Sequence, residues 1–514
     1  MSKTIIIIGA GLAGLSAALQ AAENGCNVKL VSSLPSERAQ SVMAEGGINA
    51  ALNTKDENDS PEEHFTDTIK AACGLADPNA VWGMTQAAPE LVHWLLKLGV
   101  KFNMSGYDDV DLRNFGGQKK KRTAFAQSDT GKQIMTAMID AVRRKEASGM
   151  VERFSHHSFL TLRLCGNICC GCVIRDEYSQ ETVELPGDAV IVATGGMHGL
   201  FGNTTGSLSN TGEVTAELFR LGVPLANGEM IQYHPTTVKC GGKRMLISEA
   251  ARGEGGRLFA MKDGKQWYFM EEKYPELGNL MPRDITAREI WKVSHESEVF
   301  LDTTEISEEI ISNKLSGLAD DCMTYLHKDI RKEPVSVLPG IHYFMGGILV
   351  DEQHRTPIQN LYAAGECCAQ YHGANRLGGN SLLGALYGGR VAAKSACEQA
   401  DVVDLSCATQ IDFPPASQIS EIKQLNKVMQ ETMGVVRNEN TLLNGIQTVQ
   451  ALTGNLPLLG MAVLKSALAR KESRGAHWRE DYPKSNDDDY LKTTVARFDG
   501  KQIQISFVPV PERR

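Results

Sequence analysis

The first 32 residues alternate between apolar runs that suit buried strands and a segment with helical periodicity. Residues 4–9 and 28–32 are short, mainly β-branched apolar runs, which are typical of parallel strands buried on both faces. Between them, apolar residues recur at helical spacing from Leu15 to Ala22, and Gly25 ends this pattern. The chain is therefore expected to open with a βαβ unit.

A glycine-rich turn joins the first strand to the helix. Residues 9–14, Gly-Ala-Gly-Leu-Ala-Gly, have the spacing G-x-G-x-x-G. Glycines at this spacing allow a tight turn, close approach of a pyrophosphate to the backbone, and close packing of the helix on the strand. The acidic residue that often ends the second strand is absent, and Ser32 and Ser33 stand there. The absence of this acidic residue weakens the case for NAD as the bound dinucleotide more than the case for FAD.

Later parts of the chain repeat and then interrupt this pattern. Two further apolar runs, at residues 189–196 and 361–366, end in glycine turns. Each is interpreted as a strand whose terminal turn contacts a nucleotide. Residues 235–344 lack the pattern and are richer in charge, which indicates an inserted domain. From about residue 418, apolar residues return at helical spacing. The pattern predicts an α/β chain with an insertion and a helical C-terminal region.

Composition narrows the classes of function. A chain of 514 residues with 42% hydrophobic residues can bury two or three cores. The net charge of -9, without a basic half, favours neither nucleic acid nor an anionic membrane surface. No apolar run approaches the roughly 20 residues of a membrane span, and the signal-like start is better explained as strand, turn and helix. Twelve cysteines then indicate free thiols in a reducing compartment, so a cytoplasmic location is expected.

Two clusters invite functional interpretations that the sequence does not favour. Cys165, Cys169, Cys170 and Cys172 are close together, but their spacing fits no common zinc or iron-sulfur pattern. Residues 162–174 instead suit a β-hairpin, so no metal site is expected. The basic run at residues 119–122 is interpreted as a solvated face.

Seven segments, in one order along nearly the whole chain, carry a family resemblance. They begin at Ala44, Gln232, Ser248, Pro282, His342, His372 and Arg470, and read AEGG, QYHPT, SEAARGEGG, PRD, HYFMGG, HGANRL and RKESRGAH. The chain resembles the flavoprotein subunits of succinate dehydrogenase and fumarate reductase, together with L-aspartate oxidase.

The resemblance implies a fold and a cofactor. It implies a Rossmann-like FAD-binding domain (1–234 and 345–405), interrupted by an α+β capping domain (235–344) and followed by a C-terminal helical region and tail (406–514). Relatives that bind FAD covalently use a His shortly before the Gly-Gly pair, where this chain has Gln40, Ser41 and Val42, so FAD is expected to be non-covalent. The residues expected to contact it are Gly9, Gly11, Ala13, Gly14, Ser32, Ala44, Glu45, Gly46, Gly47, Ala193, Thr194, Gly195, Glu366, Arg376, Ser381 and Leu382.

By the same resemblance, the substrate is a four-carbon dicarboxylate such as fumarate or succinate. His234 and Ser248 would hold one carboxylate, and His342 and Arg376 the other. These residue types suit the task, because Arg offers a two-pronged fork and His or a hydroxyl offers single donors. The family more often has Thr where Ser248 stands. An iron-sulfur or other electron-carrier protein is the expected partner, with a peripheral membrane location possible through a partner subunit.

The resemblance also implies that Arg283 is the proton donor and that it is reprotonated through Glu249 and Arg252. Arginine is a reluctant acid because its pKa exceeds about 12, so the assignment requires a strongly basic carbanion. Glu249 and Arg252 are three residues apart and would be neighbours on a helix.

Phe115 separates two activities within the family. L-Aspartate oxidases carry Glu at the matching position, which can pair with a substrate ammonium group, whereas fumarate reductases carry Phe. Fumarate and succinate are therefore the expected substrates. L-Aspartate oxidase, or a reductase of a related unsaturated dicarboxylate, is the alternative.

Overall fold

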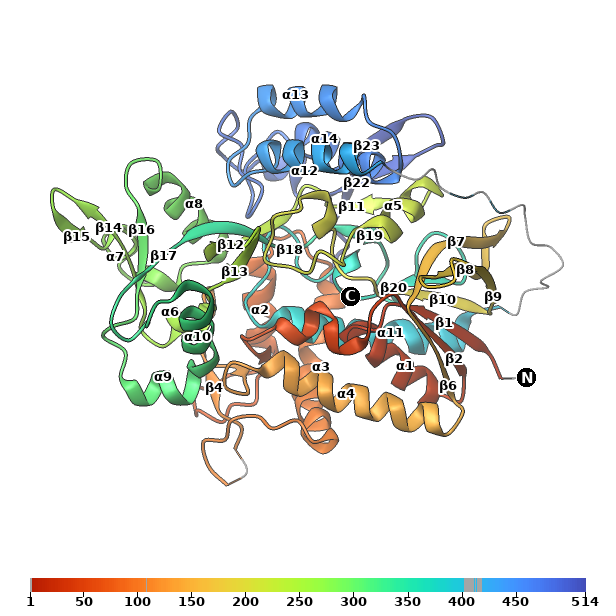
Figure 1. The fold of residues 1–514 in the computed structure, drawn as a ribbon, viewed down its shortest axis with the longest axis horizontal. Coiled ribbons are helices and arrows are strands. Elements are labelled where there is room, and N and C mark those ends of the chain that lie inside the picture. Colours follow the sequence, from red (N-terminus) through yellow and green to blue (C-terminus); the bar gives the residue numbers. More distant parts are fainter. Residues whose placement is uncertain (1, 108, 402–410, 412, 414–417) are drawn as a thin grey trace.

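A five-stranded parallel sheet forms the centre of the FAD-binding part of the molecule (Figure 1). This computed structural model describes residues 2–107, 109–401, 411, 413 and 418–514. The strand order is β20 (Leu361–Ala363), β10 (Ala189–Val192), β1 (Thr4–Ile8), β2 (Asn27–Ser32) and β6 (Val151–Ser155). On one side of β1 lie β10 and then β20, the two strands that the sequence analysis expected to end in glycine turns. On its other side lies β2, the second strand of the βαβ unit.

The alternation of side chains in β1 explains why both faces of this sheet are covered. Ile5 and Ile7 pack into one core with the helices, whereas Ile6 and Ile8 pack into another with the strands on the opposite face. The helical layer contains α1 (Leu12–Glu23), α3 (Pro78–Leu98), α4 (Thr130–Ala147) and α11 (Asn380–Gln399), with α2 (Pro61–Ala71) packed on α3. The other layer is an antiparallel sheet of β7 (His157–Cys165), β8 (Ile168–Asp176) and β9 (Thr182–Pro186).

The hairpin predicted over residues 162–174 is confirmed. β7 and β8 pair antiparallel and turn at Gly166 and Asn167. Cys169 and Cys172 are buried in the core beneath the central sheet, as small apolar residues would be. Among the described residues, no group of histidine, cysteine and carboxylate side chains could hold a metal ion.

The segment between the two FAD-binding parts extends to the left in Figure 1. Its first sheet contains β12 (Ile231–Cys240), β13 (Lys243–Leu246) and β18 (Leu338–Phe344), and its second contains β14 (Arg257–Lys262), β15 (Lys265–Trp267), β16 (Val299–Asp302) and β17 (Val335–Ser336). The helices are α6 (Glu249–Gly253), α7 (Phe269–Lys273), α8 (Arg283–Val293), α9 (Glu308–Lys314) and α10 (Ser316–Asp321). The expected domain boundary at 234/235 falls inside β12, the one at 344/345 directly follows β18, and the one at 405/406 lies outside the described residues.

The C-terminal region contains the expected helices and a strand pair that the sequence analysis missed. The helices are α12 (Ile419–Thr432), α13 (Glu439–Val449), α14 (Asn455–Ala469) and the short α15 (Asp487–Tyr490). β22 (Lys492–Phe498) and β23 (Ile503–Pro509) form a hairpin whose first strand pairs with β11 (Leu225–Ala226), next to β19 (Gly347–Leu349) and β21 (Cys368–Ala369). This region lies at the top of Figure 1, beside α5 (Glu213–Arg220). The tail is thus bonded into a sheet with both earlier parts of the chain.

One end of the basic run at residues 119–122 is not solvated, so that expectation was wrong for Arg122. Its guanidinium is completely buried and forms ion pairs with Asp59 and Asp67 at 2.9 and 3.0 Å. The pairing lies beside a three-stranded sheet of β3 (Ile48–Asn49), β5 (Thr123–Ala124) and β4 (Leu112–Arg113). A buried cation requires such partners, and both aspartates lie more than 50 residues earlier in the chain. No helix within the described part of the chain is long and apolar enough to cross a membrane.

Candidate active site

A cavity of about 800 Å³ runs from the glycine turn of β1 to the inserted segment. It brings together residues that are far apart in the sequence. All sixteen residues expected to contact FAD line it except Gly14. The expected substrate residues His234, Ser248, His342, Arg376 and Phe115 line it as well, as do Glu249 and Arg283, whereas Arg252 lies behind them.

The glycine turn is built for close contacts. Gly9 has φ +109°, and a Cβ there would lie 2.3 Å from the carbonyl oxygen of Ala193. A Cβ on Gly14 would lie 1.8 Å from the carbonyl oxygen of Gly9, so this glycine packs the helix onto the turn and does not face the cavity. A Cβ on Gly11 would meet only side-chain atoms, at 3.6 Å or more. Gly11 therefore keeps the backbone open toward the cavity, as a pyrophosphate site requires.

Two polar atoms in the cavity wall also suit a dinucleotide. Ser32 Oγ, at the end of β2, and Glu45 Oε2 are buried and have no hydrogen-bond partner among the described residues. Both residues line the cavity, and buried polar atoms normally have partners. Burial, reinforced by the charge of Asp321, raises the pKa of Glu45 to about 8. Its carboxyl is consequently protonated near neutral pH and can donate a hydrogen bond.

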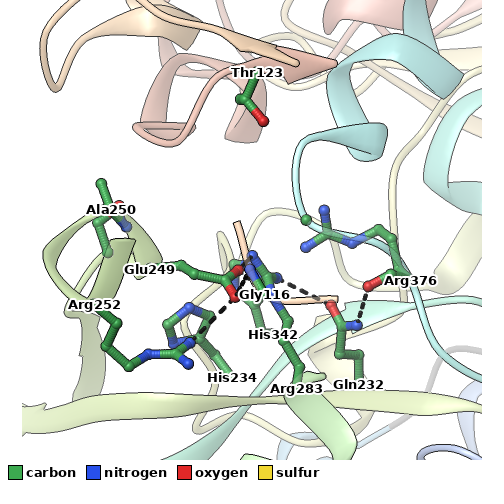
Figure 2. Close-up of polar contacts among 12 residues, drawn as sticks. Gly116, Thr123, Gln232, His234, Glu249, Ala250, Arg252, Arg283, His342 and Arg376 are labelled. Atoms are coloured by element: carbon green, nitrogen blue, oxygen red, sulfur yellow. Dashed lines mark hydrogen bonds and ion pairs between the residues drawn. The ribbon is translucent and has the colours of Figure 1, made fainter. Parts of the chain in front are cut away.

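The centre of the substrate end is a buried chain of charged side chains (Figure 2). Arg283, the first residue of α8, donates from Nε and Nη2 to Glu249 Oε2 at 2.8 and 2.6 Å. Glu249 Oε1 lies 3.4 Å from Arg252 Nη2 and accepts from the backbone N–H of Gly116 at 3.1 Å. Because α6 is helical, Glu249 and Arg252 are neighbours across one turn, as the sequence predicted.

The electrostatics of this chain keep Glu249 ionised. Burial acts to raise the pKa of its carboxyl, but Arg283 and Arg252 outweigh that effect and hold the pKa below its usual value. Burial lowers the pKa of Arg252, against the attraction of Glu249. A carboxylate between two guanidiniums can exchange a proton with either one, so the geometry suits a relay.

The imidazole rings of His234 and His342 lie near these charged side chains, and their centroids are 5.1 Å apart. Nδ1 of His234 contacts the backbone oxygen of Thr236 at 3.0 Å, and Nδ1 of His342 contacts Thr205 Oγ1 at 2.8 Å. Burial, and then the charge of Arg283, keep the pKa of both imidazoles well below its usual value. Both rings are therefore neutral at pH 7 and can act as single hydrogen-bond donors.

Arg376 places a second cation on the cavity wall. Its guanidinium lies 4.5 Å from the ring centroid of Tyr343, and its Nε is buried without a partner among the described residues. Burial, followed by repulsion from Arg283, lowers the pKa of Arg376 to about 9. A guanidinium that is short of hydrogen bonds and close to a second cation is a strong binding group for an anion.

Ser248 and Phe115 complete the expected set. Ser248 is the N-cap of α6, and its hydroxyl accepts from the N–H of Ala250 at 3.4 Å, a long contact that leaves its own proton for another acceptor. Phe115 is 1% exposed. Its ring lies so close to Gly46 and Gly378 that a Cβ on either would meet it at 2.9 or 3.0 Å. Phe115 therefore packs between two glycine segments of the cavity wall.

Several residues in this arrangement were not assigned from the sequence. Gln232 accepts from Arg283 Nη1 at 3.1 Å and donates to the backbone oxygen of Arg376 at 2.8 Å, so it links the two arginines (Figure 2). Gly116 and Tyr343 contact Glu249 and Arg376. Gln232 and Tyr343 stand inside segments that carried the family resemblance, next to residues that were assigned. Their proximity to His234 and His342 was the available signal.

Comparisons with known proteins agree with this geometry. The sequence profile of the FAD binding domain matches residues 4–382, and that of the fumarate reductase flavoprotein C-terminus matches residues 452–513. The succinate dehydrogenase flavoprotein subunit of Bacillus subtilis is 38% identical, with 100% of this chain and 98% of that protein covered. The 8-methylmenaquinol:fumarate reductase flavoprotein subunit of Wolinella succinogenes is 32% identical, with coverage of 100% and 92%.

Solved structures show the same likeness. The quinol fumarate reductase FrdA of E. coli, solved as a single-site variant, superposes with a TM-score of 0.90 at 27% identity, covering 99% of this chain and 97% of that chain. Mycobacterium smegmatis Sdh1 in complex with UQ1 superposes with a TM-score of 0.84 at 29% identity, covering 100% and 95%. With its FAD-binding fold, its capping segment and its C-terminal helices, this chain belongs to the FAD-dependent succinate dehydrogenase and fumarate reductase flavoprotein family.

Proposed function

We propose that this oxidoreductase interconverts fumarate and succinate and works mainly as a fumarate reductase flavoprotein. The observation that carries the proposal is the guanidinium of Arg283, which Glu249 and Gln232 hold in the wall of a cavity shared with Arg376. Two cations and two neutral imidazoles suit a substrate with two negative charges. Bound FAD would supply the hydride that adds to one alkene carbon.

The donors divide between the two ends of the substrate. Ser248 and His234 hold one carboxylate, and Arg376 and His342 hold the other. Because Ser248, His234 and Arg376 are buried, their hydrogen bonds to a carboxylate are stronger than they would be in solution. Together these contacts fix the alkene in one orientation.

Arg283 gives its proton to the second alkene carbon. Three of its N–H groups are used in bonds to Glu249 and Gln232, so two of the five guanidinium N–H groups are left for the substrate. Glu249 orients the donor and returns a proton to it from Arg252. This assignment gives Arg283 a role in the transition state more than in binding.

The proposal includes a protein partner that exchanges electrons with FAD. An electron carrier, iron-sulfur or of another kind, would deliver electrons to FAD, in keeping with relatives named as flavoprotein subunits of a succinate dehydrogenase and of a fumarate reductase. The domain division at residues 234/235, 344/345 and 405/406 belongs to this proposal too, with the inserted segment as a cap over the substrate.

A direct experiment separates this proposal from L-aspartate oxidation. The purified protein, reduced with dithionite under argon, should be reoxidised by fumarate within the mixing time of a stopped-flow instrument. L-Aspartate added to the oxidised protein should leave the flavin absorbance unchanged. Bleaching of the flavin by L-aspartate, with no response of the reduced protein to fumarate, would favour the oxidase instead.

We expect FAD to be released when the protein is precipitated with acid. Residues 40–42, before the Gly-Gly pair, contain no histidine, and Gln40 Oε1 accepts from the backbone N–H of Ser207 at 2.5 Å. Without a histidine at this place, FAD is expected to be held by non-covalent contacts alone. Absorbance spectra of supernatant and washed pellet measure the result, and yellow colour retained in the pellet would refute it.

Phe115→Glu should raise the KM for fumarate by about tenfold or more, because like charges brought together cost on the order of a few kcal/mol. Phe115→Leu is the matched control, since it keeps an apolar side chain against Gly46 and Gly378. Steady-state assays with a reduced dye give both KM values. Equal KM values for the two variants would show that position 115 does not face the substrate.

A further inference from the structure

Two cysteines that the proposed chemistry does not use lie side by side in the FAD-binding part of the molecule. Cys26 follows the end of α1, and Cys397 lies in the last turn of α11. They are 371 residues apart in the sequence, and their Sγ atoms are 2.9 Å apart, with both thiols free. Cys26 is buried and Cys397 is half-buried. This pair is therefore a contact that the fold creates between α11 and the segment after α1, which are far apart in the sequence.

The surroundings of Cys397 disfavour the ionised form of its thiol. Burial, and then the contact with Cys26, raise the pKa of Cys397 to about 12, and Asn24 and Lys3 act in the opposite direction. Lys3 Nζ also donates to the backbone oxygen of Cys397 at 2.7 Å. A protonated thiol is a poor nucleophile, so Cys397 is expected to react slowly with oxidants and to resist alkylation in the folded protein.

α11, which carries Cys397, and α1, which ends three residues before Cys26, also form the cavity. At their N-terminal ends, Leu12 of α1 and Ser381 of α11 line it. Ser16 Oγ donates to the backbone oxygen of Leu386 at 2.7 Å, and a Cβ on Gly389 would lie 2.2 Å from the oxygen of Ala13. α1 and α11 are thus in direct contact near the cavity, and the cysteine pair lies at their other ends.

We propose that hydrogen peroxide slowly converts Cys26 and Cys397 to a disulfide, which cross-links the segment after α1 to α11. Peroxide first oxidises the more exposed sulfur, Cys397, to a sulfenic acid, with release of one water. The thiol of Cys26 then attacks that sulfur, its proton leaves with the hydroxyl as a second water, and the S–S bond forms. Two thiols are oxidised by two electrons, and one peroxide is reduced to two waters.

The geometry requires little movement. A disulfide has an S–S length near 2.05 Å, so the sulfurs must approach by about 0.9 Å. Cys397 is near the end of its helix and Cys26 lies in a turn, which are places where the backbone adjusts most easily. The cross-link would hold together the two helices that line the FAD site, and it is independent of which substrate the enzyme reduces.

Peptide mapping of the unmodified holoprotein tests the proposal. The protein is reduced, freed of reductant, treated with hydrogen peroxide, denatured in iodoacetamide, and digested with trypsin and with a protease that cleaves after Glu. Cleavage after Glu398 is needed because Cys407 follows Cys397 in the same tryptic peptide. A linked species of residues 24–29 with 395–398, which dithiothreitol separates, is the expected product. Recovery of both peptides alkylated, or of Cys397 as sulfinic acid without a link, would overturn the proposal.

Thermal melting gives a second measurement. Peroxide treatment should raise the Tm of the unmodified holoprotein by about 3 °C, since closing so long a loop restricts the unfolded chain. The rise should be absent in Cys26→Ser and Cys397→Ser and present in Cys73→Ser, which removes a half-buried thiol far from this pair in the sequence that donates to the backbone oxygen of Ala71. A rise in all three variants, or in none of the four proteins, would contradict a stabilising cross-link at this pair.

Discussion

Replacing Arg283 with Ala is expected to lower kcat for fumarate reduction by about 10³-fold, in the range that general acids contribute, and to change KM little. The reason is geometric: its guanidinium is fixed by Glu249 and Gln232 with two N–H groups to spare, and the proposal places its action in proton transfer. Steady-state kinetics with a reduced dye give kcat and KM. The FAD content is measured on the same preparation.

A matched control for this variant lies one turn further along the same helix. Arg288 also belongs to α8, but its guanidinium packs over the ring of Trp478 at 4.0 Å and does not line the cavity. Arg288→Ala should therefore keep kcat within about twofold, since substitutions away from such sites have small effects. A near-normal kcat in Arg283→Ala would remove Arg283 as proton donor, and with it the relay through Glu249 and Arg252.

Arg376→Ala should instead affect binding and rate together. Loss of a charge-assisted hydrogen bond costs about 1.5–3 kcal/mol, which corresponds to a rise of about 10- to 100-fold in KM for fumarate, with a lower kcat because the alkene is no longer held in place. Arg376 is also among the residues expected to contact FAD, so kinetic values are to be expressed per bound flavin.

Arg376→Lys distinguishes charge from shape. Lysine keeps the cation but lacks the planar fork, and it packs less well over Tyr343. An intermediate KM is expected if both charge and fork contribute. If Arg376→Ala bound fumarate as tightly as the unmodified enzyme, one end of the dicarboxylate would have to be held by other groups.

The sequence by itself determined the local features of this protein. The strand, glycine turn and helix at residues 4–23 form as predicted, because apolar alternation and glycine spacing act over neighbouring residues. The hairpin at residues 165–168 and the Glu249–Arg252 pair are local in the same sense. The family motifs also identified an FAD-binding flavoprotein, because each motif is a short run of residues with a fixed order.

Contacts between distant segments were decided only by the tertiary structure. Gln232 joins Arg283 to the backbone of Arg376, Arg122 is buried against two aspartates, and Cys26 meets Cys397, each across at least 51 residues of chain. The C-terminal hairpin likewise joins a sheet with β11. Such contacts depend on strand order and helix packing, because the same polar residue is solvated on one face and buried on another. No local pattern in the sequence carries that information.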